Sequence, residues 1–114
     1  MNRIILLGHL TKDIAMYYPS SGKAIAKSSI ATNRRYKDKS GEQREETCFI
    51  DIVFFGKTAE TAHTYLKKGA QLLIDGRLSF EQWTDKDGHK RSRHYIIVEH
   101  MQMLGKKPQT KENQ

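Results

Sequence analysis

The sequence predicts an all-β domain with one short helix, folded as a five-stranded Greek-key barrel. Two observations predict this class. Strand-like segments recur with turn signals between them. Only one segment has apolar residues at helical spacing, and it lies between the third and fourth strand-like segments. With 114 residues, the chain is expected to form one domain over residues 1–105, with a core large enough to fold without disulfides.

Two strands and a turn account for the first third of the chain. The first strand is expected over about residues 2–10, where Gly8 indicates a bend or bulge. Residues 19–22 form a turn, and a second strand follows over about residues 23–36. Small side chains in this second strand would permit close packing in a strongly curved barrel wall.

The third strand, expected over residues 48–55, follows a polar loop with a turn at residues 38–41. Alternate side chains of a strand point to opposite faces. One face is apolar and is assigned to the core: Cys48, Ile50, Ile52 and Phe54. The other face is mixed: Phe49, Asp51, Val53 and Phe55. A carboxylate is costly to bury without a partner, so Asp51 marks this face as wet. Two phenylalanines on a wet face suggest a surface that stacks flat ligands.

The helical pattern spans residues 59–68, with Lys67 and Lys68 in its last turn and Gly69 as its stop. The fourth strand, residues 71–83, again has two faces. The apolar face is assigned to the core: Leu72, Ile74, Gly76, Leu78 and Phe80. The polar face carries Arg77 and Trp83, the only tryptophan. Tryptophan is usually largely buried, so a second core or a subunit contact stays an alternative explanation for these rings.

A turn at residues 85–88 precedes a fifth strand over about residues 91–104. Residues 106–114 contain no apolar side chain and are expected to form a short, basic, disordered tail. No internal repeat is apparent. Five strands with one helix between the third and fourth is the element order of the OB-fold, a barrel that commonly binds single strands across one face.

The net charge favours a polyanionic partner, because 20 Lys and Arg against 13 Asp and Glu give +7. No cationic amphipathic helix, signal peptide or apolar stretch of roughly 20 residues is visible. We therefore expect no membrane partner and a cytoplasmic protein. The five histidines and Cys48 lack metal-ligand spacing, so neither a metal nor another cofactor is expected.

Cations and rings coincide at several strand ends. Four cations flank Tyr36 within residues 34–39, and Trp83 precedes a basic loop. Charge and position nominate these phosphate ligands: Arg34, Arg35, Lys37, Arg77, Lys90, Arg91 and Arg93. Bases are flat and their backbone is anionic, so rings with cations suit a sequence-independent single-strand binder. Each charge run by itself is equally consistent with a solvated loop.

Three other functions fit parts of the pattern. A replication-restart adaptor of the same fold would act through protein contacts and would not need four exposed rings. An RNA binder of the cold-shock type would cluster its aromatic residues in short strand motifs, which are not seen. A nuclease would use paired acids such as Asp85 and Asp87, for which solvated loop charge is the better interpretation.

The chain resembles bacterial-type single-stranded DNA-binding proteins over residues 1–105. The matching motifs occur in the family's order: Ile5-Leu6-Leu7-Gly8-His9-Leu10 with Asp13, Ala31-Thr32, Tyr36-Lys37-Asp38-Lys39, Phe55-Gly56-Lys57 with Ala59-Glu60, Tyr65-Leu66-Lys67-Lys68-Gly69, Ile74-Asp75-Gly76-Arg77-Leu78, Trp83-Thr84-Asp85 and Met101-Gln102-Met103-Leu104-Gly105. The resemblance implies a non-catalytic OB-fold protein that binds single-stranded DNA largely independently of sequence. It also implies a homotetramer that protects single-stranded DNA in replication, recombination and repair.

The resemblance implies roles for individual residues. Four positions match the family's base-stacking sites: Tyr36, Phe49, Phe55 and Trp83. Lys57 and Lys68 match basic sites near the DNA path. Asp51 stands where a cation is expected, so it should accept a hydrogen bond from a base amine or from a neighbouring Lys or Arg. The family's acidic tail tip has no counterpart in residues 106–114, so recruitment of replication and repair proteins is not predicted.

Overall fold

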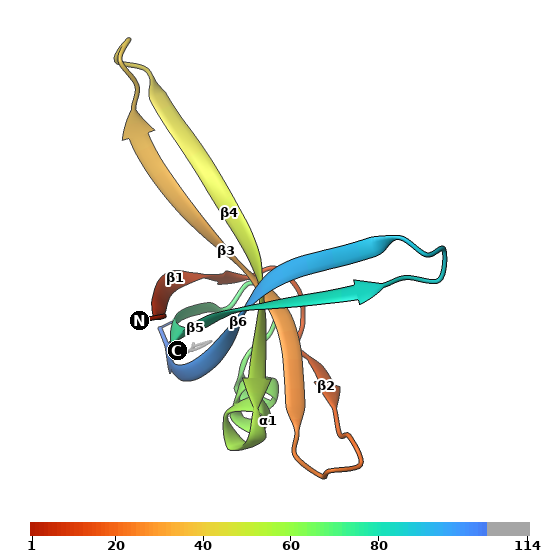
Figure 1. Cartoon of the computed structure of the whole chain (residues 1–114). Helices are drawn as coiled ribbons and strands as arrows, with labels where there is room; N and C mark the ends of the chain where they lie inside the picture. Colours follow the sequence, from red (N-terminus) through yellow and green to blue (C-terminus); the bar gives the residue numbers. More distant parts are fainter. Residues whose placement is uncertain (105–114) are drawn as a thin grey trace, which may run out of the picture.

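The computed structural model describes residues 1–104 and contains six strands and one helix (Figure 1). The strands are β1 (Ile4–Leu10), β2 (Ala15–Tyr17), β3 (Ile25–Lys37), β4 (Gln43–Phe55), β5 (Gln71–Thr84) and β6 (Lys90–Met103), and helix α1 (Gly56–Tyr65) joins β4 to β5. Five strands close into a barrel in the order β1-β5-β6-β4-β3, with β1 pairing back to β3. The predicted OB-fold is confirmed, with the helix between the third and fourth barrel strands. The short β2 beside β3 is an additional strand.

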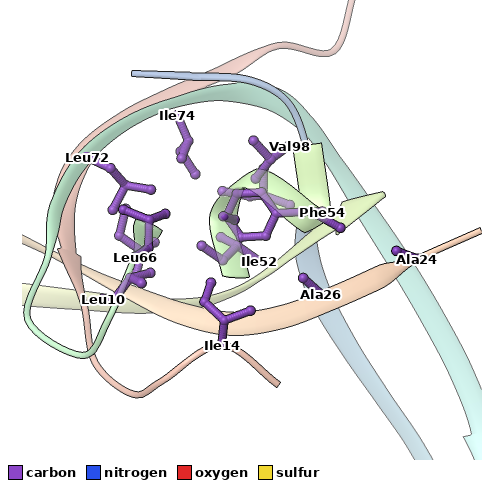
Figure 2. Close-up of a cluster of buried hydrophobic side chains, with 14 residues drawn as sticks. Leu10, Ile14, Ala24, Ala26, Ile52, Phe54, Leu66, Leu72, Ile74 and Val98 are labelled. Carbon is purple, nitrogen blue, oxygen red and sulfur yellow. The ribbon is translucent and has the colours of Figure 1, made fainter. Parts of the chain in front are cut away.

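The barrel interior is filled by the apolar faces of its strands (Figure 2). Phe54 and Ile52 of β4 are fully buried, together with Ile74 of β5 and Ile96 of β6. Each such side chain contributes roughly 1.5–3 kcal/mol through its removal from water. Helix α1 packs on this core through two alanines that are also fully buried. The core therefore sets the position of every strand that continues beyond the barrel.

Two glycines allow the backbone contacts that close the barrel. A Cβ on Gly8 would lie 2.3 Å from the carbonyl oxygen of Ala31, and one on Gly76 would lie 2.1 Å from that of Ile97. Gly8 lies where β1 passes from its long pairing with β5 to its short pairing with β3. Gly76 borders a register shift between β5 and β6. Any side chain at either position would collide with a neighbouring strand.

The two long hairpins leave the barrel and diverge from each other in Figure 1. We call residues 32–48 the first arm, from β3 and β4, and residues 78–95 the second arm, from β5 and β6. The assignment of Cys48 to the core is wrong, because this residue is exposed. Leu78 and Phe80 were also expected in the core but are 37% and 48% exposed. These residues continue the core-facing side of their strands into the arms, where no barrel interior lies beneath them.

Two element boundaries also differ from the predictions. Strand β4 begins at Gln43, five residues before the predicted start, because it pairs with β3 along the whole first arm. Helix α1 ends at Tyr65, so Lys67 and Lys68 lie in the following loop rather than in the last helical turn. Residues 106–114, predicted to be a disordered tail, lie outside the described part of the chain.

Among residues 1–104, no helix has the length and apolar character needed to cross a membrane.

Candidate nucleic-acid interface

The strand register places three of the four predicted rings on one face of the sheet. Directly opposed residues of neighbouring strands point to the same side. Asp51 of β4 is aligned with Tyr95 of β6, and β6 aligns Arg91 with Trp83 of β5. We call this side the outer face, and its members in the four longest strands include Lys27, Phe49, Asp51, Val53, Phe55, Arg77, Ser79, Glu81, Trp83, Arg91, Arg93 and Tyr95. Phe49 is 66% exposed and Trp83 44% exposed, so both rings present a flat surface to solvent.

Two further rings on this face were missed from the sequence. Tyr17 of β2 lies beside β3, and the ammonium of Lys27 is 5.4 Å from its ring centroid. Tyr95 is half-buried, with the Arg93 guanidinium 5.4 Å from its ring centroid. Strand β2 has three residues, too few for a readable alternation. The alternation Arg91, Arg93, Tyr95 was present in the sequence and could have revealed the second ring.

An ion-pair network occupies the centre of the outer face. Arg93 donates from Nη1 to Asp51 Oδ2 over 3.0 Å and from Nε to Glu81 Oε1. The prediction that a neighbouring cation holds Asp51 is therefore confirmed. The hydrogen bond to Glu81, aided by the charges of both carboxylates, raises the pKa of Arg93. Because two carboxylates compensate its charge, Arg93 attracts a phosphate less strongly than the sequence suggested.

A hollow of about 190 Å³ opens beside this network. Its lining includes Tyr17, Lys27, Asp51 and Arg93, together with Asp13. The Asp13 carboxylate accepts a 2.8 Å hydrogen bond from the backbone N–H of Lys68. The backbone of the predicted cation Lys68 is therefore held beside Asp13, one of the residues that line the hollow. The hollow thus brings one ring, that of Tyr17, together with cations and two carboxylates.

The remaining predicted arginines form exposed ion pairs. Arg34 contacts Glu46 at 3.0 Å, Arg77 contacts Glu99 at 2.8 Å, and a third pair joins Arg35 to Glu45 at 3.9 Å. Exposed pairs are worth at most about 1 kcal/mol in water, so a phosphate can displace the carboxylate. Within residues 1–104, no ion pair involves the predicted lysines: Lys37, Lys57, Lys68 and Lys90.

Tyr36 does not share the outer face. Its register partner is Arg44, so its side chain belongs to the opposite side of the first arm, together with Arg34. The Arg34 guanidinium lies 4.8 Å from the Tyr36 ring centroid. Tyr36 is 37% exposed, because both sides of the arm are open. The four predicted rings are thus accessible, but they are divided between two sides of the sheet.

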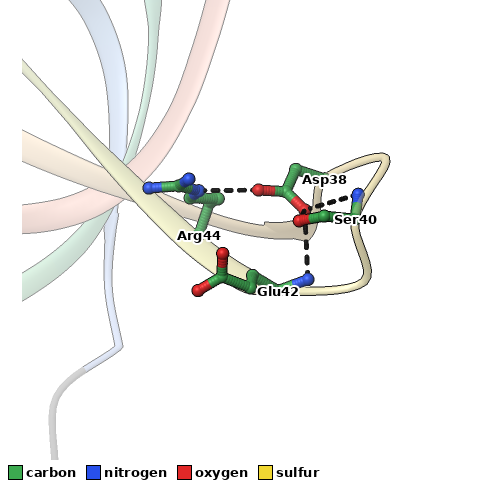
Figure 3. A network of polar contacts seen from close by, with 4 residues as sticks. All are labelled: Asp38, Ser40, Glu42 and Arg44. Carbon is green, nitrogen blue, oxygen red and sulfur yellow. Dashed lines mark hydrogen bonds and ion pairs between the residues drawn. The ribbon is translucent and has the colours of Figure 1, made fainter.

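The turn of the first arm is held by one carboxylate (Figure 3). Asp38 Oδ1 accepts hydrogen bonds from the backbone N–H groups of Ser40 and Glu42, each at 3.0 Å, and from the Ser40 hydroxyl at 2.6 Å. Its Oδ2 accepts from Arg44 Nε at 2.8 Å. The bond from Ser40 and then that from Arg44 lower the pKa of Asp38 to about 2. The Asp38 carboxylate therefore stays ionised at neutral pH and keeps these hydrogen bonds.

We expect the Asp38 carboxyl to titrate with a midpoint near 2 when its carbon resonance is followed by NMR. The unfolded chain has a pKa near 3.9 at such a residue. The turn therefore gains its full contribution above about pH 4 and loses it as the pH falls through 2. Arg44→Ala should move the midpoint upward, because it removes one donor. An unchanged midpoint in this variant would show that Arg44 does not hold the carboxylate.

The turn of the second arm contains the only group of possible metal ligands found among residues 1–104. Ligand atoms of Asp85, Asp87 and His89 lie within 4.8 Å of one another. However, Asp85 Oδ1 already accepts from the backbone N–H groups of the other two residues, at 3.0 and 2.9 Å. Its Oδ2 accepts from Arg91 Nε at 2.7 Å, and this bond lowers the pKa of Asp85. The cluster is therefore explained as a hydrogen-bonded turn.

Comparisons with known proteins agree with this geometry. A protein of Helicobacter hepaticus called single-stranded DNA-binding protein is 52% identical over 112 residues, which are 98% of this chain but only 66% of that protein. A deletion variant of the single-stranded DNA binding protein from Thermus aquaticus superposes with a TM-score of 0.81 at 32% identity, over 92% of this chain and 51% of that one. An SSB from Plasmodium falciparum, solved in complex with ssDNA, gives a TM-score of 0.84 at 24% identity, over 92% and 96% of the two chains.

The model of the Single-strand binding protein family matches residues 1–104, which are all the residues described above. This match covers both arms, the helix and every strand of the barrel. The chain therefore belongs to the single-strand binding protein family.

Proposed function

We propose that this protein binds single-stranded DNA without catalysis and largely independently of base sequence. The observation that carries the proposal is the outer face, where exposed rings on β4 and β5 lie beside cations on β3, β5 and β6. Family membership supports it, and so does the likeness in fold to a protein solved with ssDNA. This ligand would place the protein at the nucleoid in the cytoplasm, in replication, recombination and repair.

In this proposal the rings contact the bases of the DNA and the cations contact its phosphates. Phe49, Phe55 and Trp83 would each stack a base, and Tyr36 would stack one on the far side of the first arm. Stacking does not distinguish one base from another, because every base has a flat π-face. Phosphates would displace the carboxylates of the exposed ion pairs and contact the unpaired lysines. The carboxylate of Asp51 repels phosphates, so bases rather than backbone should enter the central hollow.

The test is a titration with oligo(dT) of increasing length. Stacking should quench the emission of Trp83, and light scattering on the same samples gives the stoichiometry. Poly(rU) and duplex DNA should bind more weakly, and single-stranded DNA should stay intact with Mg²⁺ present. Unchanged Trp83 emission together with an unchanged mass would overturn the proposal. Tight binding to a replication protein without DNA binding would favour the adaptor alternative.

Lys57→Ala should flatten the dependence of log affinity on log salt concentration by roughly one unit, because one phosphate contact would be lost. Lys57 lies in the first turn of α1, two residues after Phe55, and is exposed. The measurement is oligo(dT) affinity at several salt concentrations. The neighbouring Thr58→Ala serves as a control that keeps the charge and the slope. A slope in Lys57→Ala equal to that of the wild type would remove Lys57 from the phosphate path.

Self-association through β1 is part of the same proposal. Ile5 and Leu7 are 54% and 48% exposed on this strand. Strand β1 pairs with β5 from Ile4 to His9, whereas its pairs with β3 involve His9 and Leu10 alone. An open strand edge next to exposed apolar side chains favours pairing with a second copy. Pairing through this edge joins two copies, so the light-scattering mass of the free protein should be at least twice that of one chain, and four times that mass in the homotetramer that the family resemblance implies.

A further inference from the structure

The two arms end in the same turn, built twice from similar residues 47 positions apart. The first arm reads Asp38-Lys39-Ser40-Gly41-Glu42-Gln43-Arg44, and the second reads Asp85-Lys86-Asp87-Gly88-His89-Lys90-Arg91. In both turns the glycine has a positive φ, +85° at Gly41 and +82° at Gly88. In both, the aspartate N–H donates to the carbonyl oxygen four residues later, at 3.0 and 2.9 Å. The sequence analysis found no internal repeat, but the structure shows that these two seven-residue turns repeat each other.

The side-chain bonds of the two turns are also equivalent. Each aspartate accepts through Oδ1 from the backbone N–H groups two and four residues later, at 2.9 to 3.0 Å. Each accepts through Oδ2 from the Nε of the arginine six residues later, at 2.8 Å for Arg44 and 2.7 Å for Arg91. The arginine is therefore fixed at its Nε. Within residues 1–104, no hydrogen bond or ion pair engages the terminal nitrogens of either guanidinium.

A ring stands beside each fixed arginine. The register pairs Tyr36 with Arg44 in the first arm and Trp83 with Arg91 in the second. Each pair therefore lies on one side of its arm, with ring and guanidinium as neighbours. At the second tip, Trp83 and Arg91 line a hollow of about 260 Å³ together with Lys90. Each tip thus offers an aromatic ring next to a guanidinium whose terminal nitrogens are free within residues 1–104, and at the first tip Arg34 covers part of the ring.

We propose that the two arm tips are equivalent nucleotide grips, in which a ring stacks the base and an arginine held by a turn aspartate binds the adjacent phosphate. The first grip consists of Tyr36, Arg44 and Asp38, and the second of Trp83, Arg91 and Asp85. The inference rests on the proposed DNA binding and adds Arg44 to its ligands. The two aspartates are positioning residues. They do not touch DNA, but they aim the guanidinium.

Removing the negative charge of either turn aspartate distinguishes two effects on DNA binding: the positioning of the arginine by the aspartate, and the net charge of the protein. Asp38→Ala and Asp85→Ala each make the protein more basic, so charge alone would tighten binding to a polyanion. The grip model predicts the opposite. Each variant should weaken oligo(dT) binding about 3- to 10-fold, because the phosphate contact loses its fixed donor.

Matched controls come from the same turns. Glu42→Ala and Asp87→Ala make the same change in charge, and neither carboxylate has a hydrogen bond or ion pair within residues 1–104. These variants should bind as tightly as the wild type, or more tightly. The affinities are measured by the anisotropy of labelled oligo(dT) at one salt concentration, and the unfolding midpoint of each variant is recorded alongside.

A double-mutant cycle separates aiming from a general loss of turn structure. In an Arg44→Ala background, Asp38→Ala should no longer weaken binding, because there is no guanidinium left to aim. A further loss in that background would assign Asp38 a merely structural role and overturn the grip. If an alanine variant does not fold, Asp38→Asn and Asp85→Asn keep an oxygen for the backbone N–H groups. They remove only the charge that holds the arginine, and should weaken binding in the same way.

The outcomes also separate this inference from the proposed function. If wild-type protein does not bind oligo(dT), the proposed function fails and the grips fail with it. If the wild type binds and Asp38→Ala and Asp85→Ala tighten binding as their controls do, the grips are wrong and DNA binding stands. The grips are established if three results agree. Both aspartate variants bind oligo(dT) more weakly than the wild type, the control variants do not, and Asp38→Ala has no further effect once Arg44 is alanine.

Discussion

Phe54→Ala should lower the free energy of unfolding by about 3–5 kcal/mol, the usual cost of removing a buried phenylalanine. Phe54 is fully buried and lies in the middle of the barrel core (Figure 2). The cavity left behind cannot close easily, because strands from both hairpins surround it. Urea unfolding followed by circular dichroism at fixed protein concentration measures the loss. A change below about 1 kcal/mol would mean that the core packs differently.

Two variants nearby in sequence give the contrast. Phe55→Ala removes the same ring one residue later, but this ring is 37% exposed on the outer face. Its effect on unfolding should be clearly smaller than that of Phe54→Ala, and its effect on DNA binding larger. Cys48→Ala changes an exposed side chain and should alter the free energy of unfolding by no more than about 0.5 kcal/mol.

Trp83→Ala should weaken binding to oligo(dT) by about 1–3 kcal/mol, the cost of one stacked base. Trp83 is 44% exposed and is supported across the ladder by Arg91, so the ring is presented without being part of the core. Anisotropy of a labelled oligonucleotide measures the affinity, since the variant has lost its own tryptophan emission. Oligo(dT) affinity equal to that of the wild type would remove Trp83 from the interface.

Trp83→Phe provides the matched control. It keeps an aromatic face of smaller area at the same place on the arm, so it should retain part of the affinity that Trp83→Ala loses. The unfolding midpoint of both variants should stay near that of the wild type, because residues at the end of the second arm do not contact the buried cluster. Equal losses in the two variants would argue against stacking as the source of the affinity.

The two-residue alternation predicted the faces of the strands correctly within the barrel. It placed Ile52 and Phe54 in the core and Phe49 and Asp51 on the outer side, because side-chain direction follows from strand geometry alone. The same pattern failed at Cys48 and Phe80, which continue the apolar face past the end of the barrel. Burial depends on what lies above a face, and no local pattern contains that information.

The candidate site was predicted in part for a similar reason. The aromatic and basic residues of the site could be predicted from their residue type. The carboxylates that pair with the basic residues could not, because these pairs depend on how neighbouring strands are aligned. The pairing of Arg93 with Asp51 joins residues 42 positions apart. The twin turns did leave a signal in the sequence, since both contain Asp-Lys, a glycine two residues later and an arginine at the same distance. Reading that signal requires knowing that both segments close a hairpin.

The barrel is closed by far fewer contacts than those that build its hairpins. Thirteen residue pairs align β3 with β4 and thirteen align β5 with β6, whereas two pairs join β1 to β3 and three join β4 to β6. The pairs next to each hairpin turn, Lys37 with Gln43 and Thr84 with Lys90, are six residues apart, whereas the β4–β6 pairs join residues 44 positions apart, and local contacts form faster. During folding, each hairpin can therefore complete its ladder before the barrel closes, so the two arms exist before the framework that fixes the angle between them.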